Sequence, residues 1–118
     1  MANSLNQHPV DLKRIQDLAG GDKEFEQEVL RVYLTDCIER LEGLRQALEA
    51  GDNETARRHA HTIKGASCNI GTVLLHECAR RLEHCKTQEQ PKEAAALLKE
   101  LGTEFGRVQA YLEAYLNK

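Results

Sequence analysis

A histidine, a lysine and a glycine fall within five residues in the middle of the chain, at positions 61, 64 and 65. Neutral imidazole is a nucleophile near pH 7, because its unperturbed pKa is about 6.5, and its nitrogen can accept a phosphoryl group. Lys64, one helical turn from His61, can donate hydrogen bonds to anionic oxygens held there. Gly65 costs a helix interior about 1 kcal/mol relative to alanine, but it removes side-chain bulk beside His61. These residue types at this spacing could hold a phosphoryl group and let another protein reach it.

A single helix must position these residues, and we expect it to begin at Asp52 or Asn53, end near Asn69 or Ile70, and be followed by Gly71. Successive residues turn by about 100°, so His61 lies on the side of the helix opposite Ile63. The predicted buried stripe consists of Ala56, Ala60, Ile63, Ser67 and Ile70. The exposed face around His61 holds Glu54, Arg57, Arg58, Lys64, Gly65 and Cys68, and its three cations make it locally positive.

Apolar residues recur at helical spacing through most of the remaining sequence, and strand-forming residues are scarce. Four of the five expected helices have 15 or more residues with heptad-like apolar stripes and short loops. We therefore predict one all-α domain over 1–118, an antiparallel up-down-up-down four-helix bundle with a short N-terminal capping helix. Besides the helix of His61, the expected ranges are Pro9 to Leu18, Lys23 to Ala50 after a cap at Asp22, Val73 to Thr87 after a cap at Thr72, and Pro91 to Leu116.

Composition excludes several functional classes. The net charge is -3, with no basic block that would favour nucleic acid or a membrane surface. No apolar run approaches the roughly 20 residues that span a bilayer, and the N-terminus lacks a secretory pattern, so we expect a cytoplasmic protein. Three of the four cysteines, Cys37, Cys78 and Cys85, fall at apolar helix positions, which favours reduced core thiols over two disulfides. We also expect a monomer, and a start at Met1 with a helix ending near Lys118 favours a free-standing protein.

The eleven residues His61-Thr62-Ile63-Lys64-Gly65-Ala66-Ser67-Cys68-Asn69-Ile70-Gly71 resemble the signature of histidine-containing phosphotransfer (HPt) domains, roughly His-x-x-Lys-Gly-x-Ser-x-x-x-Gly. The helix order resembles that family across nearly the whole chain. The resemblance implies that His61 is phosphorylated through Nε2, that Lys64 contacts the phosphoryl group, and that Gly65 keeps the face open. A further family position, a Gln or Glu on the next helix that orients the histidine, maps by spacing to Glu83. Cys68 departs mildly from the small or hydroxylated residue expected there.

The resemblance also implies a function, that of a phosphorelay intermediate without its own kinase domain. The expected partners are response-regulator receiver domains and a hybrid histidine kinase. Receivers would supply Mg²⁺ and most catalytic groups, so we expect no cofactor on this chain. The expected partner-binding residues are Arg57, Arg58, Lys64, Gly65 and Cys68.

Three other interpretations of the sequence compete with this one. A histidine kinase dimerisation domain also presents a phosphoacceptor histidine, but it favours an acidic residue directly after the histidine, where this chain has Thr62. A metal site is disfavoured because His59 and His61 point about 160° apart on a helix, and Cys68 lies two turns, roughly 10.5 Å, from His61. A helical interaction module without chemistry would give His61 no special role.

Overall fold

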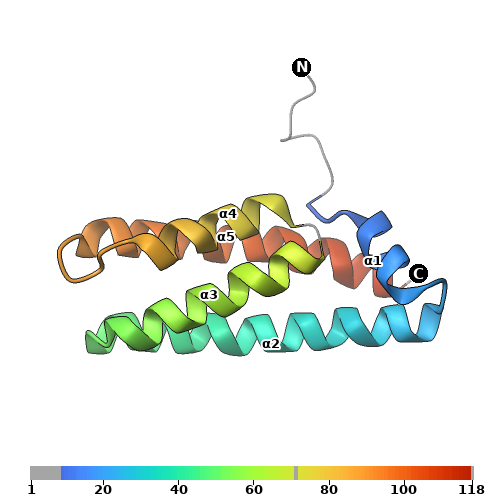
Figure 1. Ribbon diagram of the computed structural model, residues 1–118, viewed down its shortest axis with the longest axis horizontal. Helices are drawn as coiled ribbons and strands as arrows, with labels where there is room; N and C mark the ends of the chain where they lie inside the picture. Colours follow the sequence, from blue (N-terminus) through green and yellow to red (C-terminus); the bar gives the residue numbers. More distant parts are fainter. Residues whose placement is uncertain (1–8, 71, 118) are drawn as a thin grey trace, which may run out of the picture.

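The chain folds into a helical bundle in the computed structural model, which describes residues 9–70 and 72–117. Successive helices from α2 to α5 run in opposite directions, which confirms the predicted up-down-up-down bundle (Figure 1). The helices of the described residues are α1 Leu12–Ala19, α2 Lys23–Ala50, α3 Asn53–Asn69, α4 Val73–His84 and α5 Pro91–Leu116.

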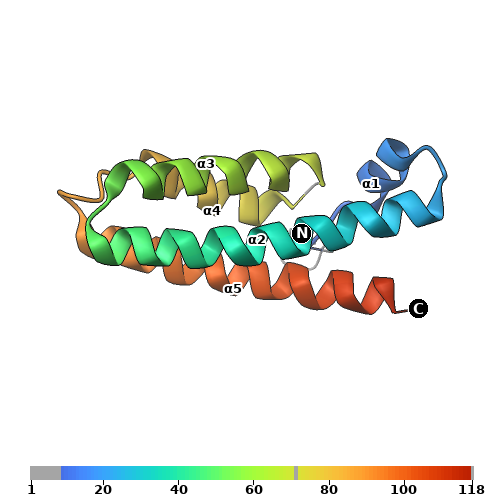
Figure 2. The same ribbon diagram turned by 90° about the horizontal axis from the view of Figure 1, so that it is seen from below.

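The helices differ in length, and this difference explains the place of α1. Helices α2 and α5 have 28 and 26 residues, whereas α3 and α4 have 17 and 12. Figure 2 shows α3 and α4 as one layer over α2 and α5, with α2 and α5 running on beyond them. Helix α1 packs on this uncovered part of α2, where Val10 and Ile15 are buried. The predicted capping helix is therefore confirmed.

The core is formed by the apolar stripes that the sequence predicts. Leu30, Leu44, Ile63, Leu101 and Leu112 are each at most 1% exposed. All five residues of the predicted α3 stripe, including Ser67, are buried. Because the α3 stripe faces inward, the opposite face of that helix, with His61, faces solvent.

Aspartates begin the first three helices. The carboxylates of Asp22 and Asp52 accept hydrogen bonds from the backbone N–H groups of Phe25 and Thr55, as the sequence predicts. The prediction that Pro9 opens the first helix is wrong. Asp11 accepts a hydrogen bond from the Lys13 N–H and α1 begins at Leu12. The side-chain cap of Asp11 therefore determines where this helix starts, whereas Pro9, two residues earlier, does not.

The fourth helix is shorter than predicted. Helix α4 ends at His84 because Cys85 is extended, with φ -75 and ψ 133. The hydroxyl of Thr87, which we expected inside the helix, instead donates a hydrogen bond to Asn53 at the start of α3. Thr72 occupies the N-cap position of α4 but makes no side-chain cap hydrogen bond. The predicted terminator Gly71 lies outside the described residues.

No helix in the described parts of the chain is long and apolar enough to cross a membrane. All four cysteines are free thiols. Cys37 and Cys78 are buried and Cys85 is half-buried, as expected for thiols at apolar helix positions, whereas Cys68 is exposed. Burial raises the pKa of the Cys37 thiol to about 11 and that of Cys78 to about 12, so both remain protonated near neutral pH.

Candidate functional site

His61 lies near the middle of α3, on the face directed away from the core. Its side chain is 65% exposed, whereas Ile63, two residues on, is 1% exposed. This contrast follows from the helical repeat, because two residues advance the direction of a side chain by about 200°. The sequence-based prediction of an exposed His61 is confirmed.

Glu83 on α4 holds both predicted active residues with one carboxylate. Its Oε2 lies 2.7 Å from Nδ1 of His61, and its Oε1 lies 2.7 Å from Nζ of Lys64. Only 9% of the Glu83 side chain is exposed, whereas Lys64 is 24% exposed. The antiparallel hairpin of α3 and α4 brings these three residues together. Lys64 is therefore an ion-paired group within the site rather than a freely solvated lysine.

The charge of Glu83 determines which nitrogen of His61 can react. The hydrogen bond from the Lys64 ammonium, together with that from His61, keeps the pKa of the Glu83 carboxyl below its ordinary value against the opposing effect of burial. An ionised carboxylate accepts hydrogen bonds but cannot donate them. The proton of neutral His61 is therefore on Nδ1, and the lone pair is on Nε2. The geometry leaves Nε2 free to act as a nucleophile.

Gly65 leaves the surface one turn beyond His61 open. Apart from its two chain neighbours and the backbone of its own helix, a Cβ atom built on Gly65 would meet no atom of the described residues within 4 Å, so packing against them does not require glycine there. Cys68, one turn further, is exposed. The absence of a side chain therefore leaves space on the solvent side, where a second protein could approach His61.

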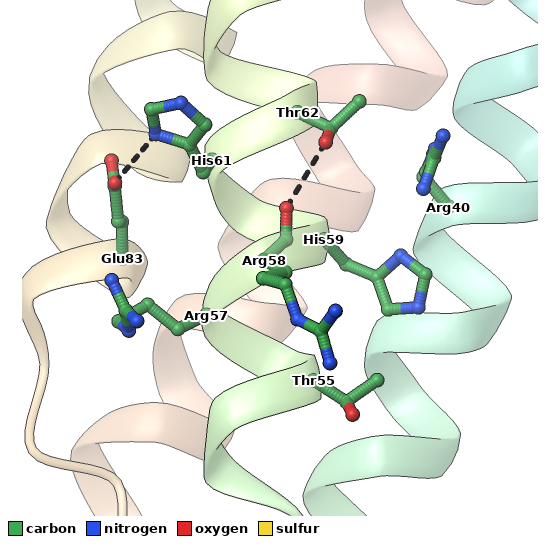
Figure 3. A pocket seen from close by; sticks show the side chains of 8 residues that line it. All are labelled: Arg40, Thr55, Arg57, Arg58, His59, His61, Thr62 and Glu83. Atoms are coloured by element: carbon green, nitrogen blue, oxygen red, sulfur yellow. Dashed lines mark hydrogen bonds and ion pairs between the residues drawn. The ribbon is translucent and has the colours of Figure 1, made fainter.

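Arginines surround a shallow cavity beside His61. Arg57 lies on the α4 side of α3 (Figure 3), and it pairs with Glu54 at 3.0 Å. Arg58 lies on the α2 side, and among the described residues no carboxylate lies within ion-pair distance of it. Arg40 of α2 also lines the cavity. The sequence-based prediction included Arg57 and Arg58 but missed Arg40, since only the packing of α2 against α3 brings it there.

His59 lines the same cavity and packs against bare backbone of α2. A Cβ atom on Gly43 would lie 2.6 Å from Nε2 of His59, so the ring occupies space that only glycine leaves. Burial, followed by the nearby Arg40 and Arg58, lowers the pKa of His59. The pairing of Gly43 with His59 was missed from the sequence, because a mid-helix glycine carries no signal of its partner.

Ser67 of the signature has a structural role. Its hydroxyl lies 3.0 Å from the hydroxyl of Tyr33 on α2, and both side chains are buried. The Thr72 hydroxyl donates to the Ser67 carbonyl at 3.0 Å, and the Thr72 N–H donates to the same carbonyl. These bonds connect α2, the end of α3 and the start of α4. They fix the hairpin that brings Glu83 to His61.

The other histidines of the described chain do not join His61 in a metal site. His76 on α4 lies 3.2 Å from the Lys64 carbonyl through its Nδ1, and His84 is exposed. Across residues 9–70 and 72–117, no three His, Cys, Asp or Glu side chains form a cluster that could hold a metal ion.

Comparison with known proteins identifies the class of this bundle. The model of the Hpt domain family matches residues 28–117, which include most of α2 and all of α3, α4 and α5, and the chain belongs to this family. The phosphorelay intermediate protein rdeA of Dictyostelium discoideum is 36% identical over 77 residues. That match covers 64% of this chain but only 30% of the Dictyostelium protein.

Longer matches extend over nearly the whole chain. Histidine-containing phosphotransfer protein 2 of Arabidopsis thaliana is 22% identical over 116 residues, covering 96% of this chain and 73% of that protein. The crystal structure of histidine-containing phosphotransfer protein B from Pseudomonas aeruginosa superposes with a TM-score of 0.85 and 29% identity, covering 95% of this chain and 96% of the other. The HPt domain of a Shewanella sensor hybrid histidine kinase shares the fold, with a TM-score of 0.67 and 22% identity.

Proposed function

We propose that this chain is a phosphorelay intermediate. His61 accepts a phosphoryl group from the aspartyl phosphate of one receiver domain and passes it to the aspartate of another. The single observation that supports this most strongly is the carboxylate of Glu83, which holds His61 and Lys64 together on an open face. Membership of the Hpt domain family and the name of the Dictyostelium relative support the same function.

The accepting step requires only the lone pair that Glu83 leaves on Nε2. In this step Nε2 attacks the phosphorus, the N–P bond forms, and the P–O bond to the receiver aspartate breaks. The bonding pair leaves with the aspartate as a carboxylate. The ring keeps its proton on Nδ1 and becomes a phosphorylated imidazolium that faces Glu83. Transfer to the second receiver is the reverse reaction with a different aspartate.

Lys64 is placed to support the charge of the phosphoryl oxygens. Its ammonium is one turn from His61 and is already directed into the site by Glu83. Phosphoryl transfer depends mainly on positioning and on stabilising charge on the equatorial oxygens. We infer that this chain contributes the nucleophile and one cation, needs no cofactor of its own, and relies on the receiver for Mg²⁺.

The partner-binding surface in this proposal is the arginine-lined face around His61. Arg57 and Arg58 were expected there, and Arg40 extends the positive surface onto α2. An acidic receiver active site would be attracted by these charges, which chiefly raise the association rate. Gly65 and Cys68 would form the open part of the same surface. A hybrid histidine kinase is the proposed source of the phosphoryl group. The monomeric state and the cytoplasmic location remain predictions.

The decisive experiment compares wild type with His61→Gln. A phosphorylated receiver domain should transfer label to the wild type, and the label should survive base but not acid. His61→Gln should accept none while its helical circular dichroism stays unchanged. His84→Gln, which removes an exposed histidine of α4, is the matched control and should accept label normally. Label on the His61→Gln variant would refute the assignment of His61, and absence of label on the wild type would favour a helical interaction module without chemistry.

A further inference from the structure

Glu83 contacts the nitrogen of His61 that the proposed reaction does not use. In phosphorylated His61 the phosphoryl group would be on Nε2, and Nδ1 could either keep its proton or lose it. Glu83 lies 2.7 Å from Nδ1, and an ionised carboxylate at that distance favours a proton there. The carboxylate cannot turn away freely, because its other oxygen is paired with Lys64.

Protonation of Nδ1 matters because it determines how the N–P bond breaks. When Nδ1 carries a proton, the phosphoryl group leaves a neutral imidazole. When Nδ1 lacks a proton, the phosphoryl group must leave an imidazolide anion, which is a much poorer leaving group. When Nδ1 is protonated, the oxygen of the nucleophile, water or a receiver aspartate, forms the new O–P bond. The electron pair of the N–P bond returns to Nε2, and no proton moves on the ring.

We propose that Glu83 keeps Nδ1 of phosphorylated His61 protonated, so that the N–P bond stays labile at neutral pH. This inference rests on the proposed function. Glu83 is then a positioning residue for the leaving group, besides orienting the ring before phosphorylation. A good leaving group suits a relay intermediate that must give its phosphoryl group to a receiver. A glutamine at this position could not supply the charge.

Most other charged groups around His61 oppose Glu83. The cations on α3 are Arg57, Arg58 and Lys64, and Arg40 and His59 line the adjoining cavity, while the Glu54 carboxylate is paired with Arg57 at 3.0 Å. These cations disfavour a positive ring. Glu83 is the only described carboxylate in contact with His61, and it is 9% exposed, whereas Arg57 is 55% exposed. Glu83 contacts the ring directly at 2.7 Å, whereas water and salt screen the charges that act on the ring through solvent. The contact with Glu83 therefore dominates.

The test measures the lifetime of phosphorylated His61 without any receiver. Inorganic phosphoramidate phosphorylates the protein directly, and ³¹P NMR then follows the decay of the phosphohistidine signal. The signal of phosphorylated His61 is identified by its absence in the His61→Gln variant. We expect Glu83→Gln to lose its phosphoryl group about tenfold more slowly than wild type near pH 8, and its pH profile to move toward lower pH. Glu77→Gln, which removes a carboxylate of α4 that pairs with Arg80, should behave as wild type.

A second measurement needs no variant at Glu83. In ¹⁵N-labelled wild type phosphorylated with phosphoramidate, the Nδ1 signal of His61 should show a bound proton at pH 7.5. Equal lifetimes and pH profiles for wild type and Glu83→Gln, or an Nδ1 without a proton, would overturn the proposal. Because no receiver takes part, these outcomes are independent of the transfer assay with His61→Gln, which judges the proposed function.

Discussion

At the scale of single residues, the absence of a side chain at Gly65 matters as much as the groups that react. The surface of His61 is open on the Gly65 side, and nothing within the protein requires glycine there. The glycine therefore costs helix stability without a packing benefit inside the chain. In the proposed function its benefit comes from a second molecule, because an approaching protein would meet a side chain at this position.

We therefore expect Gly65→Gln to slow phosphotransfer without unfolding the bundle. The side chain would extend into solvent, and helix propensity should raise the free energy of unfolding by up to about 1 kcal/mol. The transfer rate from a phosphorylated receiver should fall, while direct phosphorylation by phosphoramidate, a small molecule, should be little changed. Phosphotransfer assays quenched at successive times measure the transfer rate, and urea unfolding measures the free energy of unfolding. An unchanged transfer rate would refute the steric role of the open face.

Residue roles differ in how far the sequence reveals them. The exposure of His61 and the burial of Ile63 follow from the helical repeat alone, because both residues lie on one helix. Glu83 was placed only by the family resemblance, since its contact depends on the register of two helices. Arg40 was not predicted at all. Nothing in the sequence near position 40 indicates that α2 brings its guanidinium to the cavity beside His61.

At the scale of the helices, Gly43 and His59 fix how closely α2 and α3 approach. The imidazole of His59 lies against α2 at a point where any larger residue would collide with it. The α2–α3 contact positions the arginines on the α2 side of His61. A histidine that fills a glycine notch thus connects helix packing with the shape of the proposed partner-binding surface.

A pair of glycine substitutions tests this packing. In Gly102→Ala, the new Cβ in the interior of α5 meets nothing within 4 Å, so helix propensity should raise the free energy of unfolding by about 0.5–1 kcal/mol. Gly43→Ala gains the same propensity but displaces the ring of His59, and its net gain should be smaller. Urea unfolding of both variants measures the difference.

The double variant Gly43→Ala/His59→Ala separates the collision from other effects of position 43. Relative to His59→Ala alone, adding Gly43→Ala should stabilise the protein as much as Gly102→Ala does. Equal gains for Gly43→Ala and Gly102→Ala in the otherwise wild-type protein would mean that the notch has no energetic role.

Helix limits were the least predictable part of the fold. Some helix starts are predictable because capping aspartates and a first-turn proline act locally. Helices α2 and α3 begin directly after Asp22 and Asp52, and α5 begins at Pro91. The end of α4 has no glycine or proline to indicate it. Cys85 is extended there, and the Thr87 hydroxyl beyond it donates a hydrogen bond to Asn53 of another helix. Such a contact exists only after the bundle has formed.

At the scale of the whole molecule, a few titratable groups set how stability depends on pH. Burial and the nearby arginines lower the pKa of His59, so the unfolded chain binds a proton there more readily than the folded one. The pKa values of Glu83, hydrogen-bonded by Lys64, and of Asp52, hydrogen-bonded by Thr55, are lowered too. Stability must therefore fall as pH falls through each group's range, because the unfolded state binds more protons.

We expect the free energy of unfolding to decrease in two steps on acidification. The first step lies below about pH 6.5, where His59 of the unfolded chain becomes protonated, and the second lies below about pH 4.3, from the carboxylates. Urea unfolding at pH 7.5, 5.5 and 3.5 measures both. The variant His59→Asn should lose less stability between pH 7.5 and 5.5 than wild type does. The same loss in both proteins would show that His59 does not contribute.

The bundle packs each helix against its neighbour along the chain, and α2 meets α5 to close it (Figure 2). Contacts between neighbouring helices require only short loops to close, which lowers the entropy lost before native contacts form. Chains with such local topology fold within microseconds to milliseconds. The α3–α4 hairpin joins His61 to Glu83 by a single short turn. The pairing of His61 with Glu83 therefore lies within one hairpin of the chain, and it does not require the distant ends of the chain to meet.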